Sequence, residues 1–285
     1  MVMLEEPDVV VETHRHFIDA GARVLGVNNY AATPTRLARA GLESEFESIH
    51  QTAIQLLNRA IDESGVEPST LSRMGCIPPL AASYVAEVAP NYDLAYAEFL
   101  KIIRVQEGLV DGFLVETMSN IAEMRAARDA LVATGHSVYM GLTLEDDQSN
   151  RLRSGESLED ALDVLSQGPL DACVINCSQP EVVSSALPLL KTLGCPFGAY
   201  ANGFTTVAPL MPGGTVKDLK KRIDLSPEAY TRHALDWIQA GATIVGGCCE
   251  ISPQHIAHLH RALLDEHFEI GHFNQSAEER SYDPA

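Results

Sequence analysis

The sequence has few basic residues and no long apolar run. Its 285 residues include 20 Lys and Arg against 39 Asp and Glu, so the formal net charge is −19. No basic run could follow a phosphate backbone, and we therefore expect no nucleic-acid partner. No apolar stretch approaches the roughly 20 residues that a membrane-spanning helix requires. Residues 1–8 also lack the charged and apolar regions of a signal peptide, which predicts a cytoplasmic protein away from membranes.

Disulfides are not expected, although the sequence contains six cysteines. A small secreted protein could pair them, but cysteines in a long chain without an export signal are more commonly buried thiols or metal ligands. Cys76, Cys173 and Cys195 are typical of buried thiols. With 46% hydrophobic residues, the chain can bury a full core as one large α/β domain or as two smaller ones.

Seven short apolar runs alternate with amphipathic stretches. The runs predict strands buried on both faces and joined by helices, which together form a parallel sheet. Their alternation favours a (β/α)₈ barrel, although a doubly wound sheet also fits the periodicity. The predicted strands are 24–27, 74–77, 112–115, 138–142, 172–175, 196–200 and 243–245, and the predicted helices are 7–20, 46–64, 95–108, 121–134, 158–167 and 227–240.

The predicted elements begin with a helix, where a barrel should begin with a strand. Pro7 suits the first turn of this helix and Gly21 suits its end. The count of strands is therefore one short. We expect a barrel domain over residues 1–266 and a polar C-terminal tail over residues 267–285. The Pro- and Gly-rich stretch 209–214 predicts a long loop between a strand and a helix.

Polar residues and thiols follow the ends of several apolar runs. The carboxyl ends of the strands form the active site in a (β/α)₈ barrel, so these residues are expected to meet on one rim. They are Asn28, Asn29, Tyr30, Glu116, Thr117, Asn176, Cys177, Asn202, Cys248 and Cys249.

Three of these residues have the chemistry of a metal site. Cys248 and Cys249 follow the glycines 246 and 247, which let the backbone turn sharply, and Cys177 closes an earlier strand. Thiolates are strong ligands for soft and borderline metals. Three sulfur ligands leave one position open on a tetrahedral zinc ion, and an open position distinguishes catalytic zinc from structural zinc. The alternatives are ordinary buried thiols, a vicinal disulfide or a redox pair.

Other polar residues have weaker signals. Glu116 ends a buried run, where its charge requires a partner, either a ligand amine or a neighbouring Lys or Arg. His255, His258 and His260 lie on a predicted helix after the cysteines, where solvated or capping roles are expected. The acidic stretch 145–147 is typical of a solvated loop.

Four sequence features together resemble the zinc-dependent homocysteine S-methyltransferases over residues 5–264. They are Gly246-Gly247-Cys248-Cys249, the strand end Asn176-Cys177, the pair Glu116-Thr117 and the stretch Asn28-Asn29-Tyr30. The resemblance implies a (β/α)₈ TIM-type barrel, here without its N-terminal strand. It also implies methyl transfer from an onium-type donor to the thiol of homocysteine, which forms methionine.

The resemblance extends to individual residues. It implies a Zn²⁺ ion held by Cys177, Cys248 and Cys249. It implies that Glu116 holds the amino group of homocysteine, with further substrate contacts from Tyr30, Asn28, Thr117, Asn176 and Asn202.

Two features differ from the family pattern. Members normally begin with a strand that carries an Asp-Gly-Gly-like turn, and nothing before Leu4 resembles it. We expect an earlier start, closure by another segment, or an open seam whose strand edges favour a homo-oligomer. Glu250 follows the two cysteines, where many relatives have a small or basic residue. A non-catalytic zinc-binding or thiol-sensing barrel and a methyltransferase for another thiol or selenol remain alternatives.

Overall fold

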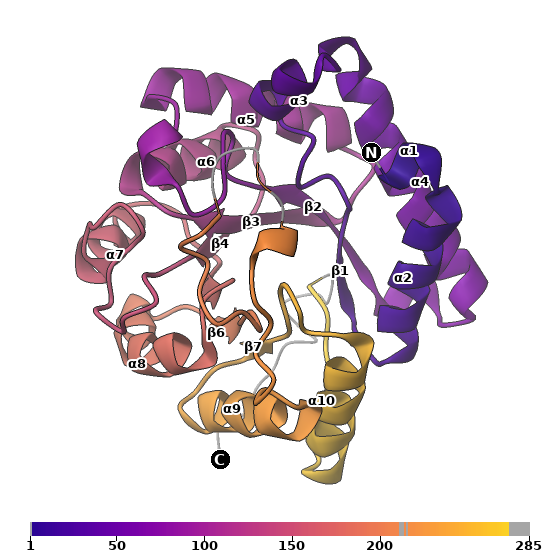
Figure 1. Cartoon of the computed structure of the whole chain (residues 1–285), viewed down its shortest axis with the longest axis vertical. Coiled ribbons are helices and arrows are strands. Elements are labelled where there is room, and N and C mark those ends of the chain that lie inside the picture. Colours follow the sequence, from indigo (N-terminus) through magenta and orange to yellow (C-terminus); the bar gives the residue numbers. More distant parts are fainter. Residues whose placement is uncertain (1, 211–213, 215, 274–285) are drawn as a thin grey trace.

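Seven parallel strands form one curled sheet, in the order in which they occur in the chain. The computed structural model describes residues 2–210, 214 and 216–273. Sequential order is typical of a barrel, whereas a doubly wound sheet reverses its order at a switch point. The barrel prediction is therefore confirmed (Figure 1). The strands are β1 (Val24–Gly26), β2 (Ser72–Ile77), β3 (Gly112–Met118), β4 (Tyr139–Leu142), β5 (Ala172–Asn176), β6 (Phe197–Tyr200) and β7 (Ile244–Val245).

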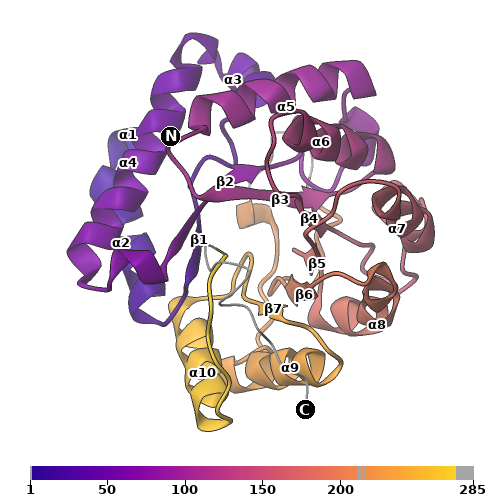
Figure 2. The same cartoon turned by 180° about the vertical axis from the view of Figure 1, so that it is seen from behind.

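The main helices surround this sheet, as the view from behind also shows (Figure 2). All six predicted helices are present, with ends that shift by at most three residues. The sequence did not indicate α8, which begins at Pro180 and contains Pro188. The ring consists of α2 (Pro7–Asp19), α4 (Phe46–Ser64), α5 (Tyr92–Gln106), α6 (Ile121–Ala133), α7 (Leu158–Ser166), α8 (Pro180–Leu190), α9 (Pro227–Gln239) and α10 (Pro253–Asp265), and α1 (Val2–Glu5) and α3 (Pro34–Ala40) are shorter.

The sheet is open between its first and last strands, while the helical ring is closed. Within the described ranges, no ladder joins β7 to β1, so the barrel is one strand short, as predicted. On the outside, α10 contacts α2. Gly21, which follows α2, lies so close to α10 that a Cβ atom would be 2.3 Å from the Cγ of His260. The seam is therefore bridged by helices rather than by strands.

The hydrophobic core has two parts. The larger part extends from Ile77 to Leu259 in sequence and fills the space between the sheet and helices α5 to α10. The smaller part contains only residues between Met3 and Leu71, with α4 contributing the fully buried Leu57. Burial of these apolar side chains is the main favourable term in folding.

The chain continues past α10 to the amino ends of the strands. Phe273 stacks on Tyr139 at the start of β4, with ring centroids 4.3 Å apart. The backbone N–H of Phe273 also donates to the hydroxyl of Ser72 at the start of β2, at 2.9 Å. The first residues of the predicted tail thus pack against the sheet, while 274–285 lie outside the described residues, as do 211–213 and 215 of the predicted loop. The domain boundary at residue 266 stays a prediction.

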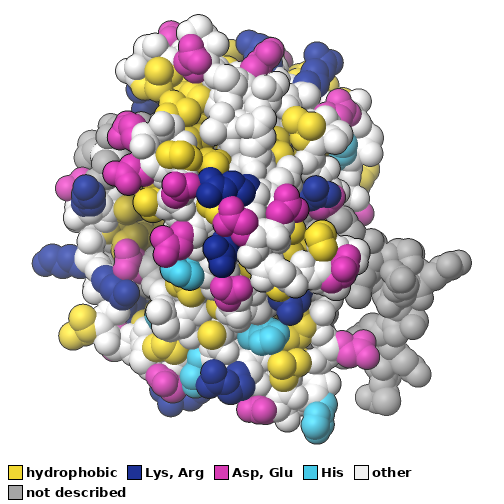
Figure 3. Space-filling view, turned by 90° about the vertical axis from the view of Figure 1, so that its right-hand side faces the viewer, with side chains coloured by type: hydrophobic (Ala, Val, Ile, Leu, Met, Phe, Trp, Pro, Cys, Tyr) yellow, Lys and Arg dark blue, Asp and Glu magenta, His cyan; other side chains and the backbone are white. Residues whose placement is uncertain are grey.

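Acidic and basic side chains are interspersed on the face that α2 and α4 form, without a continuous basic area in that view (Figure 3). Arg59 of α4 pairs with Asp8 of α2 and with Glu63, both at 2.7 Å. Such exposed pairs contribute little to stability. In the part of the chain that the structure describes, no helix is long and apolar enough to cross a membrane.

Gly198 in β6 has no room for a side chain. A Cβ atom there would lie 1.8 Å from the carbonyl oxygen of Ile244 in β7. We expect Gly198→Ala to force the two strands apart and to lower the free energy of unfolding by about 3 kcal/mol or more, measured by urea denaturation. Gly26→Ala in β1 is the matched control, because nothing lies within 4 Å of its added Cβ. Equal losses in both variants would contradict the prediction.

Candidate active site

Three cysteine sulfurs meet at the carboxyl ends of β5 and β7. Their Sγ atoms all lie within 4.8 Å of one another. Cys177 lies 2.7 Å from Cys248 and 3.6 Å from Cys249, and the last two are 4.0 Å apart. Two of these distances are close to the spacing of about 3.8 Å between sulfurs on a tetrahedral zinc ion with 2.3 Å bonds. The structure thus brings together the three cysteines that the sequence predicted as ligands.

Backbone contacts hold the three sulfurs in place. The N–H groups of Cys177 and Cys248 donate to carbonyl groups of residues 200 and 201, at 3.0 and 2.9 Å. Cys177 has a φ of +48°, which is uncommon for a residue with a side chain and requires support from its surroundings. A Cβ atom on Gly247 would lie 2.2 Å from Ile251. Gly247 is therefore needed for space, rather than for the unusual backbone angle that the sequence suggested.

Contacts within the cluster and burial shift the pKa values of the three thiols in different directions. Hydrogen bonds from Cys177 and Cys248 lower the pKa of Cys249 to about 3. Burial raises the pKa of Cys177. The pKa of Cys248 is raised by the hydrogen bond that this thiol makes to Cys177. A pre-formed set of three sulfurs within 4.8 Å of one another fits a borderline cation such as zinc.

Tyr84 adds a contact that the sequence did not indicate. Its hydroxyl oxygen lies 2.8 Å from the Sγ of Cys177. Tyr84 belongs to the loop between β2 and α5 and has a φ of +65°. In the sequence, the only sign of a role for Tyr84 is its position a few residues after a predicted strand. That position does not predict the path of a long loop.

Glu116 points from β3 toward buried polar groups rather than toward a basic side chain. The thiol of Cys76 donates to its Oε2 atom at 2.8 Å. Burial raises the pKa of Glu116. Burial, and next the Glu116 carboxylate, raise the pKa of Tyr200, whose buried hydroxyl lies near that carboxylate. Among the described residues no Lys or Arg pairs with Glu116, so the alternative of a structural ion pair is not supported.

The predicted asparagines mainly brace the strand ends. Asn176 accepts a hydrogen bond from the N–H of Thr117 at 2.8 Å and donates to the Thr117 hydroxyl at 2.9 Å. Asn202 donates to the carbonyl of Cys177 at 2.8 Å and accepts from the N–H of Phe204 at 3.1 Å. These bonds hold the loops that carry the site, and direct substrate contacts from both asparagines stay predictions.

The residues after β1 lie in different environments. Asn28 is exposed, whereas Asn29 is buried and bonds to the backbone of Cys76 through both side-chain atoms, at 2.9 and 3.1 Å. The Tyr30 hydroxyl lies 2.8 Å from that of Ser83. Arg36 covers the ring of Tyr30, with its guanidinium carbon 5.1 Å from the ring centroid.

The expectation of a solvated acidic loop at 145–147 is wrong for Asp146. Its carboxylate pairs with Arg153 at 2.9 Å and accepts hydrogen bonds from the Thr206 hydroxyl at 2.7 Å and from the Val207 N–H at 3.1 Å. Asp146 therefore links two loops, which composition cannot reveal.

The capping role expected among the histidines is confirmed for His255, which accepts a hydrogen bond from the N–H of residue 252 at 3.1 Å.

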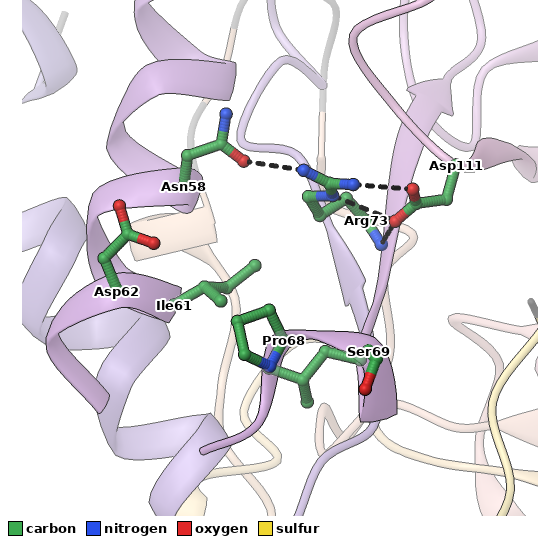
Figure 4. A pocket seen from close by; sticks show the side chains of 8 residues that line it. Asn58, Ile61, Asp62, Pro68, Ser69, Arg73 and Asp111 are labelled. Carbon is green, nitrogen blue, oxygen red and sulfur yellow. Dashed lines mark hydrogen bonds and ion pairs between the residues drawn. The ribbon is translucent and has the colours of Figure 1, made fainter. Parts of the chain in front are cut away.

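One further ion pair lies beside the site, and one pocket lies at the opposite end of the barrel. Glu250, which follows the cysteines, pairs at 3.4 Å with Lys221 of the β6–α9 connection. A pocket of about 430 Å³ lies near the start of β2, where Arg73 bonds to Asp111 at 2.7 Å and to Asn58 at 3.4 Å (Figure 4). This pocket is at the amino ends of the strands, which in such barrels serve stability rather than catalysis.

Comparisons with known proteins agree with this architecture. The Homocysteine S-methyltransferase of Escherichia coli strain K12 is 27% identical over 90% of this chain and 85% of its own length. The Homocysteine S-methyltransferase 1 of Zea mays is 26% identical over 92% and 85%. The crystal structure of the metallated homocysteine methyltransferase MmuM from Escherichia coli superimposes with a TM-score of 0.75 at 23% identity, over 92% of this chain and 86% of that one.

The similarity to this family therefore extends beyond the four motifs to most of the sequence and to the fold. A sequence profile described as Homocysteine S-methyltransferase matches residues 1–263, which include the three cysteines and the loops around them. The chain belongs to the homocysteine S-methyltransferase family.

Proposed function

We propose that the protein transfers a methyl group from an onium-type donor to the thiol of homocysteine, forming methionine. The observation that carries the proposal is the convergence of Cys177, Cys248 and Cys249 on one rim of the barrel. The names of the Escherichia coli and Zea mays relatives, each a Homocysteine S-methyltransferase, support the same acceptor.

The three cysteines would hold a zinc ion as three of its four ligands. Their donor set fits this ion, because sulfur ligands and tetrahedral coordination are typical of zinc. When bound, zinc supplies the positive charge that lowers the pKa of the homocysteine thiol from about 8.5, so that the thiolate is present at neutral pH. Tyr84 and the backbone bonds to residues 200 and 201 keep the cysteine sulfurs in place.

Glu116 would bind the ammonium group of homocysteine. Its side chain is half-buried, burial raises the pKa of its carboxyl group, and among the described residues no basic side chain neutralises it. A buried carboxylate favours a cationic ligand group strongly, because the alternative is an unpaired charge. The buried Tyr200 hydroxyl lies near this carboxylate and is available for a polar group of the same substrate.

The donor is expected to carry its methyl group on a positively charged nitrogen or sulfur. The homocysteine thiolate attacks this methyl carbon, a new S–C bond forms, and the bond to the onium atom breaks with its electron pair. The leaving group departs neutral, and the thiol proton is released to solvent. An acidic protein with a net charge of −19 attracts such a cation by long-range electrostatics.

The test combines metal analysis with an assay panel. We expect the purified protein to bind about one zinc ion per chain and to form methionine from homocysteine with at least one sulfonium or quaternary ammonium donor, detected by mass spectrometry. Removal of the metal by a chelator should abolish turnover, and added zinc should restore it. Zinc binding without turnover on any donor would favour a non-catalytic zinc-binding barrel. Faster turnover with selenohomocysteine or a simple alkyl thiol would favour the other acceptor class.

A further inference from the structure

A chain of side-chain contacts connects the Cys177 sulfur to a distant acidic residue. The Tyr84 hydroxyl lies 2.8 Å from this sulfur. The guanidinium carbon of Arg153 lies 5.1 Å from the centroid of the Tyr84 ring, a favourable position for a cation over an aromatic face. Arg153 in turn donates to Asp146 at 2.9 Å. Three residues therefore lie in series behind one sulfur of the cluster.

Arg153 is held firmly in this position. Its side chain is only 4% exposed. A charge buried to this degree costs several kcal/mol unless it is paired and hydrogen-bonded. Besides Asp146, its Nε atom donates to the Thr143 hydroxyl at 3.3 Å, and that hydroxyl lies 3.3 Å from the carbonyl of Cys177. The guanidinium cannot leave the Tyr84 ring without losing these partners.

Asp146 brings a third loop into the same arrangement. Its Oδ2 atom accepts from the Thr206 hydroxyl and the Val207 N–H, both in the connection between β6 and α9. Val207 belongs to a small apolar cluster against which Tyr84 and Cys249 pack. One carboxylate thus joins the loops that follow β4 and β6 and, through Arg153, the loop that follows β2.

We propose that Asp146 and Arg153 are positioning residues that hold the Tyr84 hydroxyl on the Cys177 sulfur and thereby set how tightly the three-cysteine cluster binds its metal. The inference rests on the proposed function only in that the cluster binds zinc. Tyr84 needs such support, because its φ of +65° is unfavourable for a residue with a side chain. A hydroxyl that donates to a ligand sulfur fixes the direction of that ligand and tunes its charge.

The test measures zinc affinity by competition with a chromophoric chelator. Tyr84→Phe keeps the ring beneath Arg153 and removes only the hydroxyl, and we expect the zinc dissociation constant to rise about 10-fold. The charge-transfer bands of the cobalt-substituted protein should shift as well. Asp146→Asn should weaken zinc binding in the same direction. The double variant should bind zinc no more weakly than Tyr84→Phe alone, because Asp146 acts through the hydroxyl.

The design separates positioning from general structural damage. Asp147→Asn changes an exposed neighbour of the same charge and should leave both the zinc affinity and the cobalt spectrum unchanged. If Asp146→Asn does not fold, Arg153→Lys replaces it, because it keeps the positive charge and loses the flat group over the ring. An unchanged zinc affinity in Tyr84→Phe overturns the inference, and so do independent effects that multiply in the double variant.

Failure of the inference and of the proposed function can be told apart. Zinc affinity is measured without substrate, so a protein that binds zinc with the expected coupling but forms no methionine would contradict only the methyltransferase activity. A wild-type protein that binds no zinc would overturn both.

Discussion

Replacing Cys248 by serine is expected to remove metal binding and methyl transfer together. A serine hydroxyl is a poor ligand for zinc, and the two remaining cysteines supply only half of a tetrahedral site. Loss of an outer-shell partner typically weakens metal binding about 10- to 100-fold, and loss of a direct ligand should weaken it more. We expect zinc content after dialysis to fall to background and kcat/KM to fall at least about 100-fold, because the homocysteine thiol stays protonated at neutral pH.

Cys195→Ser provides the matched control for this variant. Cys195 is a free, partly exposed cysteine that lies outside the three-cysteine cluster. Its replacement should leave zinc content and kcat/KM unchanged. Circular dichroism and thermal unfolding of both variants would show whether the barrel is intact. Retention of stoichiometric zinc in folded Cys248→Ser would contradict the assignment of Cys248 as a ligand.

Replacing Glu116 by glutamine is expected to weaken homocysteine binding by about 100-fold. The change keeps the shape of the side chain and removes its negative charge, and hydrogen bonds to charged groups contribute about 1.5–3 kcal/mol. The amino group does not react, so it is held equally in the ground state and the transition state. We therefore expect KM for homocysteine to rise while kcat changes little, measured by steady-state kinetics on the zinc-loaded protein.

The same variant makes a pH dependence testable. Burial raises the pKa of Glu116, so its carboxylate becomes neutral at a higher pH than an ordinary glutamate. As the pH falls through this raised pKa, KM for homocysteine should increase in the wild-type protein, and this inflection should be absent in Glu116→Gln. The control acceptor is 4-mercaptobutanoate, which lacks the amino group. If Glu116→Gln weakened both acceptors equally, Glu116 would not be the amine-binding residue.

Strands such as β2 and β5 could be predicted because nearly every residue in them is buried. A run such as 172–175 is apolar without interruption, which is typical of a central strand of a parallel sheet. The helices with one apolar face were equally visible. Helix α8 could not be predicted, because Pro180 and Pro188 both count against a helix in the sequence. Pro180 in fact occupies the first turn of α8, where proline is tolerated.

The site could be predicted only where strands position it. Cys177 and Cys248 follow strands of one parallel sheet, so their convergence follows from topology once the strands are known. Tyr84 and Asp146 lie on loops, and their positions depend on how these loops pack on one another. The bracing by Asn176 could not be foreseen for a similar reason, since it depends on which backbone group of β3 lies opposite.

The seam between α2 and α10 also sets an order for assembly during synthesis. The ring of helices closes where Gly21 meets His260, so it cannot close until residue 260 has left the ribosome. Residues 3–71 already contain a separate apolar cluster, which can form once residue 71 has emerged. The surface of α2 that α10 covers in the folded protein therefore stays exposed while the rest of the chain is translated. Binding by a chaperone during this interval is expected to fall on α2.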